Sequence, residues 1–85
     1  MVDEADFIGR LTSVFREQLD DEKLKIRMDT VRADLESWDS LAHVRIVMGV
    51  EAAYGIQLDV AEIESIKSVR DFYDSVNAHL STKQR

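Results

Sequence analysis

The sequence predicts an all-α fold: a four-helix bundle with a short third helix and a long loop between the first and second helices. Two observations lead to this prediction. Apolar residues recur at intervals of three and four along most of the 85-residue chain, which is the spacing of one helix face. Residues that break helices are scarce, because the chain has no proline and only three glycines.

The first helix is expected over about residues 3–18. Asp3, Glu4 and Asp6 fall in its first turn, where negative charge interacts favourably with the helix dipole. Its inward stripe consists of Phe7, Ile8, Leu11, Val14, Phe15 and Leu19.

A connection over about residues 20–38 follows, and one this long is uncommon in a compact domain unless it is functional. Its first residues, Asp20 to Glu22, lack the spaced oxygen pattern of a calcium loop, so we expect a solvated acidic turn. Apolar side chains are spread along the rest, which indicates an ordered loop pinned to the core. These residues are Leu24, Ile26, Met28, Val31, Leu35 and Trp38. Trp38 is expected to anchor the loop on the helices.

The second helix is expected over about residues 40–54. Either Asp39 or Ser40 can cap it by accepting a hydrogen bond from a free backbone N–H. Gly55 suits the left-handed position that ends a helix. The apolar residues of this helix, which we assign to the core by default, are Val44, Val47, Met48 and Val50.

Two further helices are expected over about 60–65 and 69–80. Asp59 and Glu62 have the spacing of a capping box, and Ser68 can cap the last helix. The inward stripe of the last helix consists of Val69, Phe72, Tyr73, Val76 and Leu80. We expect residues 1–85 to form one domain, with a core over about 3–80 and a flexible polar tail over 81–85.

The composition narrows the class of function. The net charge is −6, from 17 acidic and 11 basic residues, so nucleic acids and membrane surfaces are poor partners. The absence of cysteine excludes disulfides, thiolate catalysis and Cys-ligated zinc. No signal peptide or membrane-spanning run is visible, which favours a cytoplasmic protein. We expect it to be a monomer. A chain this small has little room for an enzyme pocket, so we expect a binding or carrying role.

The informative motif is Trp38-Asp39-Ser40-Leu41, which places a serine at the start of a helix. The N-terminus of a helix has unpaired N–H groups and partial positive charge. Both would stabilise a phosphate esterified to the Ser40 hydroxyl. The tripeptide Asp-Ser-Leu is weak evidence by itself, because serine at a helix start is commonly only a cap.

The surrounding pattern extends this motif over most of the chain. The matching residues are Asp34-Leu35, Asp39-Ser40-Leu41, Val44, Ile46, Val47, Met48, Glu51, Tyr54-Gly55-Ile56, Leu58, Ile63, Ile66, Ser68-Val69 and Phe72. Through them the chain resembles the acyl carrier protein family of phosphopantetheine-binding carrier domains. The resemblance covers about residues 20–80, and the first helix more loosely.

The resemblance implies a non-catalytic carrier. Ser40 would take a 4′-phosphopantetheine arm from coenzyme A, installed by a phosphopantetheinyl transferase. Asp39 would help to place the metal and cofactor of that transferase, and Leu41 would dock partner enzymes. The thiol of the arm would carry acyl-type cargo as a thioester, for the acyl-activating, synthase or transferase enzymes of its pathway. The family also implies that an acyl chain can enter between the second and third helices, where Met48 would form an adaptable wall.

The chain departs from the usual motif of fatty-acid-synthesis carriers, Asp-Leu-Gly-x-Asp-Ser-Leu. Between Asp34 and Ser40 it has one extra residue and no glycine, and Ala42, His43 and Arg45 follow where acids are common. We therefore expect a carrier of a specialised pathway. Polyketide, peptidyl and sugar- or lipid-modifying pathways are all consistent with the sequence. The residues expected to contact partners are Leu41, Val44, Arg45, Met48, Glu51 and Ile66. Arg45 and Glu51 are expected to help select the dedicated partner enzymes.

Other interpretations remain. The chain could be an interaction or regulatory module without an arm, in which Ser40 is a plain cap. A helix-turn-helix nucleic-acid binder is disfavoured by the charge, and a serine hydrolase by the lack of a Gly-x-Ser-x-Gly elbow. Of the two histidines, His43 is expected at the surface, and His79 in the last turn of its helix as a partner of the dipole.

Overall fold

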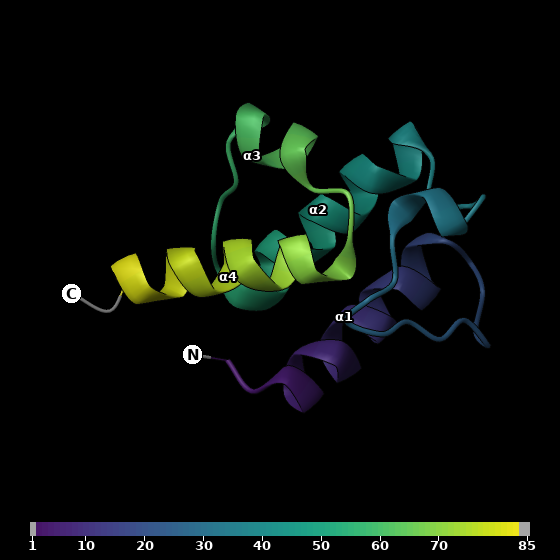
Figure 1. Cartoon of the computed structure of the whole chain (residues 1–85), viewed down its shortest axis with the longest axis horizontal. Coiled ribbons are helices and arrows are strands. Elements are labelled where there is room, and N and C mark those ends of the chain that lie inside the picture. Colours follow the sequence, from purple (N-terminus) through teal and green to yellow (C-terminus); the bar gives the residue numbers. More distant parts are fainter. Residues whose placement is uncertain (1, 84–85) are drawn as a thin grey trace.

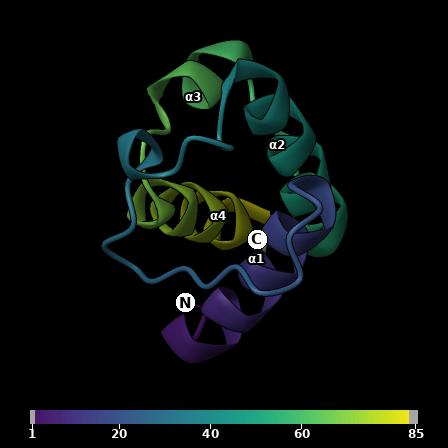
Figure 2. The ribbon, with the colours of Figure 1, turned by 90° about the vertical axis from the view of Figure 1, so that its right-hand side faces the viewer.

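The structure is a computed structural model that describes residues 2–83. Its α-helices are α1 (Glu4–Gln18), α2 (Ser40–Tyr54), α3 (Val60–Ser65) and α4 (Val69–Lys83), and a 3-10 turn spans Arg32–Asp34. The predicted all-α fold with a short third helix and a long first loop is confirmed. Figure 2 looks nearly along α4, and shows the other helices and the long loop surrounding it. No helix within residues 2–83 is long and apolar enough to cross a membrane.

The core forms where the inward stripes of the long helices meet (Figure 1). The predicted stripe of α1 is confirmed at Phe7, Leu11 and Phe15, each at most 1% exposed. The remaining apolar core positions of the helices are Ala42, Ile46, Val47 and Val50 of α2 with Val69, Phe72, Tyr73 and Val76 of α4. The start of the chain is tied to α4 as well, because the Tyr73 hydroxyl donates a hydrogen bond to the Val2 carbonyl at 2.6 Å.

Side-chain caps determine where the helices begin. The Asp39 carboxylate accepts from the Ala42 N–H at 2.9 Å, so Asp39 and not Ser40 is the cap of α2. The predicted capping box of Asp59 and Glu62 is confirmed. The Ser68 hydroxyl accepts from the N–H of Asp71 at 3.1 Å at the start of α4. Gly55 ends α2 with φ of 63°, the left-handed conformation expected of it.

The loop between α1 and α2 is ordered and pinned, as predicted. Ile26 and Trp38 bury their side chains in the core, at 5% and 2% exposure. The loop also pairs with the segment between α3 and α4. The Arg32 N–H donates to the Lys67 carbonyl at 2.8 Å, and the Val69 N–H donates to the Thr30 carbonyl at 2.9 Å.

The last helix is longer than expected, and this makes the expectation for His79 wrong. α4 continues to Lys83 instead of ending near residue 80. Nothing in Ser81-Thr82-Lys83 breaks a helix, whereas residues 84–85 lie outside the described residues. His79 consequently lies more than one turn before the helix end. Its Nε2 instead lies 2.9 Å from Oε1 of Glu62, which links α4 to α3.

The contact between α1 and α2 depends on a small residue, which leads to a first prediction. A Cβ atom on Gly49 would lie 2.6 Å from Cγ1 of Val14, whereas one on Gly9 would meet nothing within 4 Å. Replacing a helical glycine by alanine favours the helix by about 1 kcal/mol, but overpacking costs roughly 1–3 kcal/mol. Urea unfolding should therefore show Gly9→Ala to be stabilised and Gly49→Ala to be less stable than Gly9→Ala by about 2 kcal/mol.

A double variant separates packing from helix propensity. Adding Val14→Ala to Gly49→Ala removes the clashing methyl group, so the two changes together should cost less than the sum of each alone. Equal stabilisation by Gly9→Ala and Gly49→Ala would contradict the close approach of α1 and α2.

Candidate functional site

Ser40 is the first residue of α2, and its side chain is exposed at the tip of the helix. The first hydrogen bond of the helix runs from the His43 N–H to the Asp39 carbonyl at 2.8 Å. The N–H groups of Ser40 and Leu41 precede that bond, so they belong to the unpaired set that a helix N-terminus presents. An anionic group on the Ser40 oxygen would therefore meet the positive end of the helix dipole.

Trp38 fixes the start of α2 against the rest of the bundle. Its indole lies edge-on to Phe15 of α1, with ring centroids 4.9 Å apart, and is stacked near Phe72 of α4 at 6.1 Å. Its Nε1–H donates to Nδ1 of His43 at 2.9 Å. Because Trp38 is only two residues before Ser40, this packing holds the Ser40 hydroxyl in one place relative to three helices.

His43 is buried at 5% exposure, so the expectation of a surface residue was wrong. Its Nδ1 accepts from the indole of Trp38, which leaves Nε2 to donate to the Ile63 carbonyl at 2.8 Å. The sequence did contain a signal for this burial. Ile46, Val47 and Val50 follow His43 at intervals of three, four and seven, which is the spacing of one helix face.

The outer face of α2 is apolar next to Ser40. Leu41, Val44 and Met48 are 63%, 50% and 62% exposed, and Arg45 is exposed between them. The default assignment of Val44 and Met48 to the core was therefore wrong. Met48 is also not a wall of a space between α2 and α3, because its side chain lies at the surface. The four residues form one continuous face, which we call the outer face of α2.

Two of the residues expected to contact partners lie outside the outer face of α2. Ile66 is 1% exposed and belongs to the core, so its side chain does not offer a surface contact. The Glu51 carboxylate is half-buried and accepts from the Leu58 N–H at 2.8 Å, which fastens the turn after α2. Neither residue is part of the outer face.

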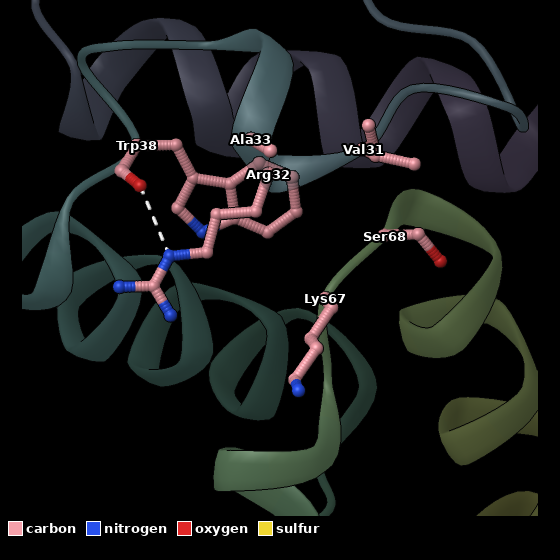
Figure 3. A pocket seen from close by; sticks show the side chains of 6 residues that line it. All are labelled: Val31, Arg32, Ala33, Trp38, Lys67 and Ser68. Atoms are coloured by element: carbon pink, nitrogen blue, oxygen red, sulfur yellow. Dashed lines mark hydrogen bonds between the residues drawn. The ribbon is translucent and has the colours of Figure 1, made fainter.

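Arg32 is a site residue that sequence reasoning missed. Its Nη2 donates to the Ser40 Oγ at 3.3 Å and its Nε donates to the Trp38 carbonyl at 3.1 Å. No periodicity connects it to Ser40, because it lies in the 3-10 turn of the loop. A groove of about 580 Å³ begins beside it and is lined by Val31, Arg32, Ala33, Trp38, Lys67 and Ser68 (Figure 3).

The buried histidine leads to a second prediction. His43→Ala leaves the Trp38 indole N–H and the Ile63 carbonyl without their partner and opens a cavity, which should cost roughly 2–4 kcal/mol of unfolding free energy. His79→Ala is the matched control, because its contact with Glu62 is partly exposed and should be worth about 0.5 kcal/mol. Urea denaturation checks both variants, and equal losses would contradict the buried role of His43.

Comparisons with known proteins bear on what this site does. No family model matches the chain. The acyl carrier protein of Thermosynechococcus vestitus is 24% identical over 76 residues, covering 89% of this chain and 94% of that protein. The solution NMR structure of a holo acyl carrier protein from Geobacter metallireducens superposes with a TM-score of 0.79 and 31% identity, over 92% of this chain and 90% of the other. The sequence and the fold of this chain both show that it belongs to the acyl carrier protein family.

Proposed function

We propose that the chain carries acyl-type intermediates as thioesters on a 4′-phosphopantetheine arm attached to Ser40. The observation that carries this proposal is the exposed Ser40 hydroxyl at the first position of a 15-residue helix, in a chain of the acyl carrier family. An ester at that oxygen needs no rearrangement of the core, because the side chain already faces outward. We propose that the whole chain, residues 1–85, acts as this single carrier domain.

The residues around Ser40 fit a phosphate ester. The attachment atom lies at the positive end of α2, and the Arg32 guanidinium is already 3.3 Å from it. When bound, the arm supplies the thiol that forms a thioester with the cargo. The chain itself provides the attachment hydroxyl, a cation beside it and a fixed position.

We propose that Ser40 is not a catalytic nucleophile. A nucleophilic serine needs a base that can take its proton. The hydrogen bond described for the Ser40 hydroxyl comes from Arg32, which only donates, and the His43 ring is engaged by Trp38 and Ile63. The carboxylate of Asp39 is occupied by the cap of α2.

The proposed partners follow from the outer face of α2. A phosphopantetheinyl transferase would reach Ser40 over Asp39 and Leu41, and the synthase, transferase or acyl-activating enzymes of a specialised pathway would contact the same face. Because this face combines apolar side chains with Arg45, it suits a partner surface that is apolar and carries an acidic group. We propose that the chain works as a cytoplasmic monomer.

A third prediction tests the attachment site. Incubation with coenzyme A, Mg²⁺ and a broad-specificity phosphopantetheinyl transferase should add one phosphopantetheine to the wild type and none to Ser40→Ala, as measured by intact-protein mass spectrometry. Ser37→Ala is the matched control, because Ser37 is an exposed serine three residues earlier, in the loop before α2, and its loss should leave loading unchanged. A folded wild type that two different transferases fail to load would favour an interaction module without an arm.

A fourth prediction concerns docking. Leu41→Glu places a charge in the apolar part of the outer face and should lower kcat/KM for loading by about tenfold, the equivalent of ~1.4 kcal/mol of binding. Val60→Glu makes the same chemical change at an apolar residue of α3 that is 71% exposed, and should have little effect. Arg45→Glu should change the rate at which the partner enzymes of the pathway use the loaded carrier. Unchanged rates in Leu41→Glu and Arg45→Glu would show that partners bind elsewhere.

A further inference from the structure

Arg32 lies beside the proposed attachment site and has no acidic partner among the residues that the structure describes. Among the described residues, the ion pairs within 4.0 Å join Arg27 to Asp29 and His79 to Glu62. The Arg32 guanidinium instead donates to two neutral acceptors, the Ser40 hydroxyl and the Trp38 carbonyl. In a chain with 17 acidic residues, an arginine held in this way is available to an anion at Ser40.

The groove that begins at Arg32 has an apolar lining and two cationic residues. Val31, Ala33 and Trp38 supply the apolar part, and Figure 3 shows the two cationic side chains on different segments, Arg32 on the long loop and Lys67 before α4. The walls are held by the two backbone hydrogen bonds between the loop and the segment before α4. The volume of about 580 Å³ is that of a site for an extended small molecule.

We propose that this groove is the resting site of the arm, with Arg32 as the residue that binds its phosphodiester. The inference rests on the proposed attachment at Ser40. A guanidinium gains more from an anionic oxygen than from a neutral hydroxyl, because charge-assisted hydrogen bonds are roughly twice as strong. The apolar dimethyl segment that follows the phosphate in pantetheine then lies against Val31, Ala33 and Trp38.

Two features favour the attached arm over a free ligand as the occupant. The arm is tethered at an oxygen that Arg32 already contacts, so its effective concentration at the groove is high. The order of chemical groups also agrees, because the anionic end of the arm is at Ser40 and the groove continues from Arg32 along an apolar wall. A resting site of this kind would hold the arm against the carrier until a partner draws it out.

The test compares unloaded and loaded forms of the wild type, Arg32→Gln, Arg32→Lys and Arg45→Gln, with loading confirmed by mass for each. Loading should raise the folding equilibrium constant, measured in urea, by about tenfold in the wild type. Arg45→Gln removes the same charge from the outer face of α2 and should keep this increase. Arg32→Gln should lose most of it, and Arg32→Lys should keep a part.

A second measurement does not depend on the stability of any variant. In ¹H–¹⁵N NMR spectra of the wild type, loading should shift the signals of the Arg32 Nε–H and the Trp38 indole N–H and leave the Arg45 Nε–H in place. The single tryptophan makes the indole signal unambiguous. If neither the Arg32 nor the Trp38 signal moves on loading, the proposal is wrong.

The outcomes separate this inference from the proposed function. A wild type that cannot be loaded overturns both. A loaded chain in which Arg32→Gln keeps the full tenfold increase overturns the resting site alone. If Arg32→Gln slows loading but leaves that increase unchanged, Arg32 serves the transferase reaction and the groove does not hold the arm.

Discussion

The burial of Trp38 is the interaction on which the rest of the site depends. Its ring is packed against Phe15 of α1 and Phe72 of α4, and its N–H bonds to His43 of α2. One side chain of the long loop thus contacts all three long helices. Burial of so large a ring is worth several kcal/mol, which offsets part of the entropy lost when the loop is ordered.

With Trp38 packed in this way, α2 has an inner face that is buried and an outer face that is exposed. The inner face places His43, Ile46 and Val50 in the core, where they hold the helix. The outer face leaves Leu41 and Met48 exposed next to Ser40, and an exposed apolar face of this kind is suited to partner contacts. Ser40 lies exposed at the tip of the helix, so its hydroxyl is accessible without any change in the core.

Much of the fold could be predicted from the sequence, because local signals determined it. Caps at Asp59 and Ser68 and the terminating Gly55 gave the starts and ends of the helices. The site was harder, because the burial of each α2 residue depends on which side faces the bundle. His43 and Met48 were assigned to the wrong sides for this reason. Arg32 could not be predicted, because only the folded loop brings it to Ser40.

The hydrogen exchange rate of the Trp38 indole N–H, measured by NMR before and after loading of Ser40, tests the central claim most directly. If Trp38 anchors the loop through His43, this proton should exchange only through global unfolding in both forms, as the core amides of α2 do. Exchange at the rate of a free indole, with the amides of α2 still protected, would show that the loop opens by itself. The anchored site described here would then be contradicted.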